Sequence, residues 1–485
     1  MTLRLSDLVK RDLSVDPQIQ GITADSRKVR PGWLFAALPG AKVDGRSFAP
    51  RALEQGAAAI LAGREIEGVS APMVIASDPR RAYALAAAAF WGAQPATCVA
   101  VTGTNGKTSV AGFCRQMFAS AGFKSASMGT LGVRVSAPGV ADEQITPPGL
   151  TTPDAADVAE LMARVAQAGV THLALEASSH GIDQRRLDGV RLAAAGFLNL
   201  TQDHLDYHGT MGVYRAAKLR LFETLLTRGR TAVLNADSDA YAAFAGTAVS
   251  AGQGVMSVGE AGQGLKLLGR SLLPGGQALK IAFQGKTYDL RLPLAGAFQA
   301  SNALVAAGLC IAAGLSPEQA FAGLEKIEGA PGRLQRVGTG PKGGEAYVDY
   351  AHTPDGLETV LKALRPHVRG KLIVVFGAGG DRDRTKRPLM GKIAADLADL
   401  AIVPDDNPRS ETPAAIRAEI MAGNAGLKEV GDRRDAIRAA VADLADGDIL
   451  VVAGKGHEQG QTVGDVVHPF DDVHETVEAL EDFHG

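Results

Sequence analysis

The chain has 485 residues, of which 46% are hydrophobic and 21% charged, an ordinary globular composition with enough length for about three domains of roughly 150 residues. Its formal net charge of −3 provides no field that would attract nucleic acid or an anionic membrane, so neither is expected as a partner. The three cysteines lie far apart among apolar neighbours, which excludes a disulfide framework and predicts free thiols in the cytoplasm. The N-terminus has no hydrophobic signal core, and the longest apolar stretch is about half the length of a membrane span.

The first block, residues 1–94, is predicted to be a small α/β domain. Strands are expected at Trp33–Leu38 and Ala58–Leu61, and helices at Pro50–Gln55 and Asp78–Gly92. The block ends where Gln94 and Pro95 interrupt the pattern, because a residue before proline disfavours the helical conformation.

The second block, residues 95–335, alternates strands with helices, which predicts a parallel sheet with crossover helices. Strands are expected at Cys98–Val101, Leu173–Leu175, Ala194–Leu198 and Ala232–Leu234, and helices at Ser109–Gly122, Asp154–Ala168, Gly212–Leu226 and Ala300–Gly314. Between Gly254 and Leu294 the chain has more glycine and shorter apolar runs, so we predict an antiparallel extension at the edge of the sheet.

The third block, residues 336–485, is predicted to be a second open α/β sheet. Strands are expected at Ala346–Asp349, Leu372–Phe376, Leu400–Val403 and Ile449–Val452, and helices at Gly356–Arg365, Lys386–Asp399, Thr412–Ala422 and Arg434–Leu444. In such sheets, ligands bind beyond the carboxyl ends of the strands.

A phosphate-binding loop is predicted between the first strand and the first helix of the second block. Its sequence is TGTNGKTS, formed by Thr102, Gly103, Thr104, Asn105, Gly106, Lys107, Thr108 and Ser109. Glycines allow backbone N–H groups to point at phosphate oxygens, the helix N-terminus and the lysine add positive charge, and the threonine hydroxyl can bind Mg²⁺. The general Walker A spacing is not met, because Val101 stands where its first glycine would be. A glycine-rich turn between strand and helix is the alternative.

Two further sets of polar residues point to the same nucleotide site. Glu176 ends a predicted strand, where a carboxylate can hold the Mg²⁺ of a bound nucleotide or can simply cap a turn at the surface. His204 and His208 have helical i,i+4 spacing, which is compatible with a zinc pair. Because no third ligand has motif spacing, a single imidazole on the nucleotide's Mg²⁺, or a hydrogen-bonded structural histidine, is favoured.

Taken in order, these motifs resemble those of the Mur ligase family. The loop TGTNGKTS is similar to the family's ATP loop, and EASSHGIDQRR at Glu176–Arg186 and NLTQDHLDYHG at Asn199–Gly209 are similar to its next two signatures. Further matches are Gly332-Arg333, VDYAHTP at Val348–Pro354, GGDRDRTKRP at Gly379–Pro388 and GKGHE at Gly454–Glu458. The resemblance implies a three-domain α/β architecture, with a small N-terminal UDP-binding domain, a central P-loop ATPase domain built on a parallel sheet, and a C-terminal Rossmann-like domain.

The resemblance also implies a catalytic centre for amide-bond formation. Lys107, Glu176, His204 and Lys218 would be catalytic, and Thr108, Glu176, His204 and a carbamate on Lys218 would bind Mg²⁺. ATP would be bound by Gly103–Ser109 together with Asn302, Arg333 and Asp349. Considered without the family, Lys218 is interpreted as an exposed cation on a helix.

The DNPR sequence at Asp406–Arg409 resembles the signature of the family members that add meso-2,6-diaminopimelate, whereas lysine-adding members lack this arginine. Diaminopimelate differs from lysine by a second carboxylate, which a planar guanidinium can bind through two parallel hydrogen bonds. The residues implied around this distal end are Arg382, Asp406, Asn407, Pro408, Arg409, Gly454 and Glu458, and Glu458 would pair with its ammonium group. Without the other matches, Arg409 would be interpreted as a surface arginine after a proline turn.

The N-terminal block resembles the family's UDP-binding domain, although its sequence matches less closely than that of the ATP loop. The contacts implied for a UDP-linked muramoyl dipeptide are Ala24, Ser26, Ala41, Lys42, Val43, Thr151, Thr152, Ser178, Gln184 and Arg186. From its residue type alone, Ser26 could instead cap a helix or lie in a solvated loop.

The function implied is ATP-dependent addition of meso-diaminopimelate to the D-glutamate γ-carboxylate of UDP-N-acetylmuramoyl-L-alanyl-D-glutamate, through an acyl phosphate, in peptidoglycan precursor synthesis. ATP is the co-substrate, Mg²⁺ the cofactor, and a cytoplasmic monomer is expected to act on these small molecules. The alternatives are a lysine-adding ligase, a folylpolyglutamate synthetase-like ligase, an ATP-dependent switch and a catalytically silent scaffold. Arg409 argues against the first of these, and DNPR with the UDP-like block argues against the second.

Overall fold

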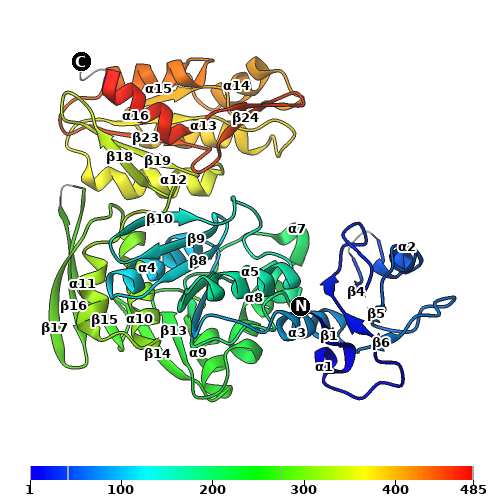
Figure 1. Ribbon diagram of the computed structural model, residues 1–485. Coiled ribbons are helices and arrows are strands. Elements are labelled where there is room, and N and C mark those ends of the chain that lie inside the picture. Colours follow the sequence, from blue (N-terminus) through cyan, green and yellow to red (C-terminus); the bar gives the residue numbers. More distant parts are fainter. Residues whose placement is uncertain (1, 41–42, 274, 483–485) are drawn as a thin grey trace. The chain divides into compact units, whose positions relative to one another are not determined.

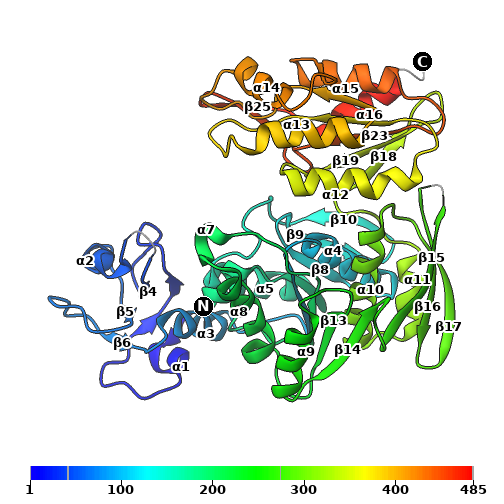
Figure 2. The same ribbon diagram turned by 180° about the vertical axis from the view of Figure 1, so that it is seen from behind.

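The computed structural model describes residues 2–40, 43–273 and 275–482, which fold as two compact units. One unit comprises the chain up to Lys266 together with Leu304–Gly323, and the other comprises Leu267–Ala303 together with the chain from Leu324 onward. Strand β15 (Leu265–Leu273) and helix α10 (Ala297–Ala312) each pass from one unit into the other. Figures 1 and 2 show the elements of both units, coloured from blue at the N-terminus to red at the C-terminus.

The first unit begins with a four-stranded parallel sheet of order β3-β4-β5-β6. Its elements are β1 (Leu3–Arg4), α1 (Leu5–Val9), β2 (Gln18–Ile19), β3 (Gly21–Thr23), β4 (Trp33–Ala37), the 3-10 turn η1 (Gly45–Phe48), α2 (Ala49–Glu54), β5 (Ala59–Ala62), β6 (Met73–Ile75) and α3 (Pro79–Trp91). Successive residues of β4 face opposite sides of the sheet, so Leu34 packs with α1 and α3 while Phe35 packs with α2. The Asp78 carboxylate accepts the Arg81 N–H and so fixes where α3 begins.

A larger sheet forms the middle of the first unit, in the order β10-β9-β8-β11-β7-β12-β13-β14, and β14 pairs parallel with the start of β15. Its elements are β7 (Thr97–Thr102), α4 (Lys107–Ser120), β8 (Ser125–Gly129), β9 (Gly132–Ala137), β10 (Val140–Gln144), α5 (Ala155–Gln167), β11 (His172–Glu176), α6 (Ser179–Asp183), β12 (Ala194–Phe197), α7 (Leu205–His208), α8 (Met211–Arg220), the π-helical turn η2 (Leu221–Leu225), β13 (Thr231–Asn235), α9 (Tyr241–Ser250), β14 (Gly254–Gly259) and α11 (Pro317–Leu324). The strands from β8 to β14 in this order are parallel, whereas β9 and β10 are antiparallel at one edge. Thr102 and Glu176 end the central strands β7 and β11, at the sheet edge where ligands bind in α/β folds.

Close packing of α10 on this sheet depends on two glycines. A Cβ on Gly196 in β12 would lie 3.0 Å from Leu309, and a Cβ on Gly308 would lie 2.6 Å from a methyl carbon of Val233 in β13. Glycine therefore allows the helix to approach these strands more closely than any other residue would. As a result, a segment from late in the chain covers β12 and β13.

The second unit contains the antiparallel hairpin β16–β17 and an open sheet of order β18-β19-β23-β20-β21-β22. Its elements are β16 (Gly276–Phe283), β17 (Lys286–Leu292), β18 (Gln335–Thr339), β19 (Glu345–Asp349), α12 (Pro354–Leu364), the 3-10 turn η3 (Arg365–His367), β20 (Leu372–Phe376), α13 (Lys386–Leu397), β21 (Leu400–Val403), α14 (Pro413–Met421), β22 (Lys428–Glu429), α15 (Arg433–Ala442), β23 (Ile449–Ala453), β24 (Gly460–Val463), β25 (Val466–Pro469) and α16 (Asp472–Asp482). Val374 of β20 packs with α12, α13 and α14, and Val375 packs with α15 and α16. Because both faces of this sheet are covered by helices (Figure 1), its central strands are continuous apolar runs.

The strands and helices predicted from the apolar patterns are present, although many of their ends are shifted. The predicted helix Gly212–Leu226 is α8 followed by the π-helical turn η2. The antiparallel prediction for Gly254–Leu294 is partly wrong, because β14 pairs parallel with β13 and the antiparallel pairing is that of β16 with β17. Glycine content indicates turns, but it does not determine strand direction. None of the helices within the described ranges is long and apolar enough to cross a membrane.

A buried ion pair between Arg433 and Asp472 is predicted to stabilise the C-terminal sheet. Both side chains are fully buried and are joined by two N–H···O bonds of 2.7 Å. Asp472→Ala removes this bidentate partner from a buried guanidinium, which typically costs about 3–5 kcal/mol of stability. In hydrogen exchange, we expect faster exchange in β20 and β23 and unchanged exchange in β7 and β11. Unchanged protection of β23 would contradict the prediction.

Candidate active site

The predicted phosphate loop follows β7 and is fixed by hydrogen bonds to the segment after β12. Gly106 has a φ of +88°, which favours glycine, and α4 begins at the next residue. Lys107 Nζ donates to two carbonyl oxygens of the loop at 2.9 and 2.8 Å. Asn199 Oδ1 accepts the Asn105 N–H at 2.9 Å, and Asn199 Nδ2 donates to the Asn105 carbonyl at 3.2 Å. The first and third sequence signatures therefore meet at this loop.

The carboxylate of Glu176 lies beside the loop and is almost completely buried. Its Oε2 accepts a hydrogen bond of 2.9 Å from Thr108 Oγ1. Thr130 donates its N–H to Oε1 at 2.8 Å and its hydroxyl to Oε2 at 3.2 Å. A Cβ on Gly129 would lie 2.0 Å from Oε1, so the end of β8 requires glycine to come this close. The alternative of a surface carboxylate that caps a turn is therefore wrong.

Lys218 is buried beneath the phosphate loop, so its interpretation as an exposed cation is wrong. The sequence of α8 does not predict this burial, because the groups that cover Lys218 come from elsewhere in the chain. Its Nζ donates to the Gly103 carbonyl at 2.8 Å and lies 4.4 Å from the centre of the Tyr214 ring. Burial, and then the charge of Lys107, lower the pKa of Lys218 well below its usual value. The lowered pKa favours the neutral amine, which is the form that can react with carbon dioxide to give a carbamate.

The two histidines at i,i+4 spacing have different environments. His208 is buried, and its Nε2 lies 3.0 Å from Ser179 Oγ, which identifies it as a hydrogen-bonded structural residue. His204 has a left-handed φ of +52°, and its Nε2 lies 3.3 Å from Asp203 Oδ2. Among the residues that the structure describes, no three His, Cys, Asp or Glu side chains are grouped as a metal site, so the zinc interpretation gains no support.

The candidate contacts to the peptide part of the muramoyl dipeptide form one hydrogen-bond network next to Glu176. They are Thr151, Thr152, Ser178, Gln184 and Arg186. Thr152 Oγ1 donates to the Glu176 carbonyl at 2.8 Å and accepts the N–H and the hydroxyl of Ser178 at 3.1 and 3.0 Å. Arg186 donates to the Thr152 carbonyl at 2.6 Å and to Gln184 Oε1 at 2.7 Å. Thr151 Oγ1 lies 3.0 Å from the hydroxyl of Thr130, which itself contacts Glu176.

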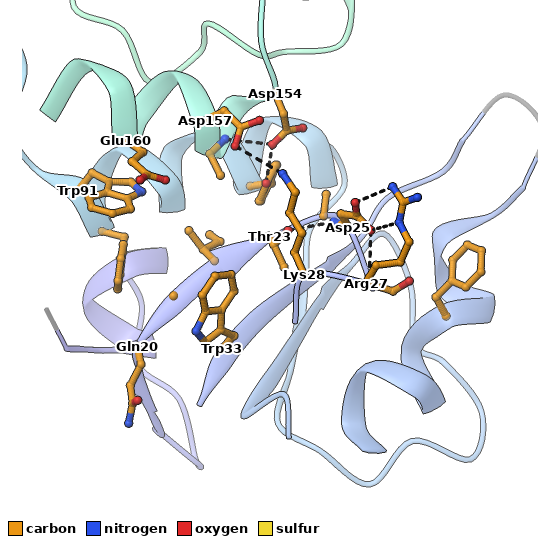
Figure 3. A pocket seen from close by; sticks show the side chains of 18 of the residues that line it. Gln20, Thr23, Asp25, Arg27, Lys28, Trp33, Trp91, Asp154, Asp157 and Glu160 are labelled. Atoms are coloured by element: carbon orange, nitrogen blue, oxygen red, sulfur yellow. Dashed lines mark hydrogen bonds and ion pairs between the residues drawn. The ribbon is translucent and has the colours of Figure 1, made fainter. Parts of the chain in front are cut away.

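A cavity of about 910 Å³ lies between the N-terminal sheet and α5. Figure 3 shows Trp33 and Trp91 towards one end of it, and Asp25 and Arg27 towards the other. The Arg27 guanidinium donates to the Asp25 carboxylate at 2.9 and 2.8 Å and lowers its pKa to about 2. The cavity therefore has an aromatic end and an end with a fixed ion pair.

The candidate UDP contacts are only partly brought together. Ala24 and Ser26 line the cavity, and Ser26 is buried. Val43 is half exposed, and its carbonyl accepts the Gly40 N–H at 3.1 Å. Ala41 and Lys42 lie outside the described residues.

In the second unit, Arg333 and Asp349 belong to one cluster. The Arg333 guanidinium lies 4.6 Å from the centre of the Tyr350 ring. Asp349 is buried and accepts the N–H groups of Leu334 and Ala351 at 2.6 and 2.7 Å. Burial raises the pKa of Asp349, although the charge of Arg333 opposes the shift. Asn302, the other candidate ATP contact outside the loop, is buried in α10 and donates to Gln299 Oε1 at 3.1 Å.

The DNPR loop follows β21 at the carboxyl edge of the C-terminal sheet. Arg409 has a φ of +50°, and its guanidinium donates to the Gly380 carbonyl at 2.7 Å. Asn407 Nδ2 donates to Glu458 Oε2 at 3.1 Å. Burial raises the pKa of Glu458, and the charge of Asp406 adds to this shift. The DNPR loop and the GKGHE segment together place a guanidinium, an amide and a carboxylate at one end of the sheet.

The remaining residues of this group are Gly454, Pro408 and Arg382. A Cβ on Gly454, which has a φ of +121°, would lie 2.8 Å from Asp406 Oδ2. The Pro408 carbonyl oxygen lies so near Gly380 that a Cβ there would come within 1.9 Å of it. The Arg382 side chain is exposed and donates to the Asp381 carbonyl at 3.0 Å.

Lys455 is a candidate functional residue that the sequence did not single out, although it lies within the GKGHE motif. It is fully buried, and its Nζ donates to Asn407 Oδ1 and to the Gly460 carbonyl, both at 2.8 Å. The Thr462 N–H also donates to Asn407 Oδ1, at 2.9 Å. Because the oxygen of this amide faces two donors, its nitrogen is turned towards Glu458. A lysine between two glycines directly after a buried strand is the signal that could have indicated this role.

The residues present fit Mg²⁺ in part. The hydroxyl of Thr108 and the carboxylate of Glu176 are hard oxygen ligands next to the phosphate loop, which suits Mg²⁺ bound to nucleotide phosphates. The amine of Lys218 does not suit this cation, whereas a carbamate on the same nitrogen would supply anionic oxygen ligands.

Three family models match the chain in succession. They are the Mur ligase family catalytic domain at residues 18–91, the Mur ligase middle domain at 101–310 and the Mur ligase glutamate ligase domain at 332–456. The UDP-N-acetylmuramoyl-L-alanyl-D-glutamate–2,6-diaminopimelate ligase of Caulobacter vibrioides is 70% identical over 482 residues, which cover 99% of each chain. The protein of the same name from Rhizobium meliloti is 52% identical over 464 residues, covering 96% of this chain and 94% of its own length. A solved structure with this name has a TM-score of 0.76 at 34% identity and covers 100% of both chains.

Gly129→Ala is predicted to displace the Glu176 carboxylate. The added Cβ would clash with Oε1 and weaken charge-assisted hydrogen bonds that are each worth about 1.5–3 kcal/mol. We expect Mg²⁺-dependent ATP binding, measured by titration calorimetry, to weaken by at least about tenfold. Gly112→Ala on α4 is the matched control, because a Cβ there would meet no atom within 4 Å. Equal affinities in the two variants would contradict the role of Gly129.

Proposed function

The chain belongs to the Mur ligase family, and from this premise we propose that it is the ATP-dependent ligase that adds meso-2,6-diaminopimelate to UDP-N-acetylmuramoyl-L-alanyl-D-glutamate. The new amide joins an amino group of diaminopimelate to the γ-carboxylate of the D-glutamate residue, and the product is a peptidoglycan precursor. Relatives that match nearly the whole chain carry this activity in their names.

The observation that carries the proposed acceptor is the arrangement of Arg409, Asn407 and Glu458. A guanidinium suits the distal carboxylate of diaminopimelate, and L-lysine has no such carboxylate. Glu458, whose pKa burial raises, suits the distal ammonium group, because a bound cation favours its ionised form. In a lysine-adding ligase, Arg409 would have no distal carboxylate of the acceptor to bind, so that alternative is not favoured.

Activation of the glutamate carboxylate is proposed to occur at the phosphate loop. The γ-phosphoryl group of ATP passes to the carboxylate and gives an acyl phosphate and ADP. The amine of diaminopimelate then attacks the acyl carbon and phosphate leaves, so the protein mainly positions the reactants and neutralises charge. Lys107, at the start of α4, would neutralise the moving phosphoryl group. Arg333, Asp349 and Asn302 are proposed as further contacts to ATP.

Mg²⁺ is the proposed cofactor, with Thr108, Glu176, His204 and a carbamate on Lys218 as its ligands. When bound, it would neutralise phosphate oxygens. The hydrogen bond of 2.9 Å between Thr108 and Glu176 supports the first pair of ligands. Conversion of Lys218 to an anion would also replace repulsion from Lys107 by attraction, which supports the carbamate.

The sugar nucleotide is proposed to bind along the first unit. Ala24, Ser26 and the loop that contains Ala41, Lys42 and Val43 would contact the UDP part. Thr151, Thr152, Ser178, Gln184 and Arg186 would contact the peptide part, and their network with Glu176 supports this assignment.

We place the reaction in the cytoplasm, where ATP is available and thiols stay reduced. Cys98, Cys114 and Cys310 are all free and buried, which agrees with such a compartment. A monomer is proposed because one chain supplies every candidate residue.

The acceptor specificity is tested by phosphate release from ATP and Mg²⁺ with UDP-N-acetylmuramoyl-L-alanyl-D-glutamate. We expect turnover with meso-diaminopimelate and little with L-lysine or without an amine. Arg409→Ala should lower kcat/KM for diaminopimelate by roughly a hundredfold, because a charge in the bound acceptor loses its partner. Arg369→Ala is the control, since this exposed arginine pairs with an exposed aspartate. Equal use of lysine would refute the specificity, and turnover without any amine would refute the ligase.

The state of Lys218 is tested by ¹³C NMR of protein equilibrated with ¹³C-labelled bicarbonate. Its lowered pKa keeps the amine neutral at lower pH than an exposed lysine, so a carbamate signal is expected at neutral pH and should disappear as acid protonates the amine. The signal should be absent in Lys218→Ala and present in Lys280→Ala, which removes an exposed lysine of β16. A spectrum that is the same for both variants would exclude the carbamate at Lys218.

A further inference from the structure

Tyr207 lies where the histidine cluster meets the proposed peptide contacts. It belongs to the short helix α7, between His204 and His208, and its side chain is partly exposed. Its hydroxyl donates to Asp183 Oδ2 at 2.8 Å and accepts from Gln184 Nε2 at 3.1 Å. Neither the sequence motifs nor the mechanism above gives this hydroxyl a task.

The direction of these two hydrogen bonds is fixed by charge. An ionised carboxylate only accepts, so the Tyr207 proton must point at Asp183. The phenolic oxygen is then an acceptor, and Gln184 must present its nitrogen to it rather than its oxygen. The Gln184 oxygen is thereby turned towards Arg186, which donates to it at 2.7 Å.

The fixed amide in turn holds Arg186. This side chain is half-buried, and its guanidinium donates to the Thr152 carbonyl at 2.6 Å and to Gln184 Oε1 at 2.7 Å. Burial lowers the pKa of Arg186, which still stays protonated, and its buried N–H groups need acceptors. Thr152 continues the network to the Glu176 carbonyl.

The ring of Tyr207 is held independently of its hydroxyl. It lies 4.2 Å from the ring of His180 and 4.7 Å from that of His208, centre to centre. His180 also contacts the His204 ring at 4.8 Å. A phenylalanine at position 207 would keep these ring contacts and lose only the two hydrogen bonds.

We propose that Tyr207 is a positioning residue for the UDP-muramoyl dipeptide, acting through the amide of Gln184 to orient Arg186. This inference rests on the proposed function, since it assumes that Gln184 and Arg186 face the peptide end of that substrate. Tyr207 itself touches no reacting atom in this scheme. Its hydroxyl accepts from the Gln184 nitrogen and so holds the amide with its oxygen on the arginine.

The first test is Tyr207→Phe. We expect KM for UDP-N-acetylmuramoyl-L-alanyl-D-glutamate to rise by roughly fivefold, the typical effect of one lost hydrogen bond, while kcat and the KM values for ATP and diaminopimelate stay within about twofold. Tyr241→Phe is the matched control, because it removes a hydroxyl from α9, next to the hydrophobic core of the same unit. A uniform loss in all parameters, or no change in the dipeptide KM, would overturn the proposal.

The second test separates orientation from simple contact. Asp183→Asn replaces an acceptor-only carboxylate by an amide that can also donate, so the tyrosine oxygen is no longer held as the acceptor for Gln184 Nε2. We expect this variant also to raise the dipeptide KM by about fivefold, and to add little when combined with Tyr207→Phe. Full additivity would overturn the proposed coupling.

Direct titration of the UDP-muramoyl dipeptide, without ATP or diaminopimelate, distinguishes this inference from the proposed ligase activity. If the wild type binds the dipeptide but gives no diaminopimelate-dependent turnover, the ligase proposal fails. In that case a fivefold weaker dissociation constant in Tyr207→Phe would still support the positioning role. Equal binding by wild type and variant would overturn it, provided that their melting temperatures agree.

Discussion

The buried carboxylate of Glu176 joins the parts of the first unit on which the candidate active site depends. Its side chain accepts hydrogen bonds from Thr108, at the start of α4, and from Thr130, after β8. Its backbone carbonyl accepts the hydroxyl of Thr152, which begins the network of peptide contacts. A carboxylate taken out of water must be satisfied by such donors, and here the donors to the side chain come from two separate segments. The phosphate loop, the candidate metal ligands and the candidate peptide contacts therefore meet at one residue, Glu176.

Two side-chain amides are likewise held in one orientation by their hydrogen-bond partners. One lies among the candidate diaminopimelate contacts and the other among the candidate peptide contacts. Asn407 has its oxygen held by Lys455 and by the Thr462 N–H, so its nitrogen meets Glu458. Gln184 has its nitrogen held by a tyrosine hydroxyl, so its oxygen meets an arginine. In both places a charged group fixes the polarity of an amide that could otherwise rotate by half a turn. Orientation is thus determined outside the residues that would touch the substrates.

The sequence predicted the central strands and the phosphate loop because those features are local. Strands covered on both faces are continuous apolar runs, and Gly106 and Lys107 stand next to each other in the chain. The hairpin β9–β10 was not predicted, because edge strands carry weaker patterns. The parallel pairing of β14 was not predicted either, because its glycine-rich segment indicates turns without determining strand direction.

Much of the candidate site could also be predicted, because whole motifs resemble those of a known family. What could not be predicted depends on segments that meet only in three dimensions. Lys218 lies near arginines on α8, and its burial arises from the phosphate loop. Lys455 and Tyr207 act through partners far away in sequence, and residue type alone does not give the direction of a hydrogen bond. The domain boundaries at residues 94 and 335 stay predictions.

The path of the chain through α10 has a consequence for biosynthesis. Helix α10 packs closely on β12 and β13 at Gly196 and Gly308. The ribosome adds this helix only after β15, the strand that leads into the second unit. While residues up to Lys266 are leaving the ribosome, one face of those strands has no cover, and apolar surface stays open to other contacts. The first unit can therefore close only after the ribosome has added residues through Gly323, and its folding cannot simply follow the order of synthesis. Until then, the nascent chain exposes the apolar surface of β12 and β13 that α10 later buries.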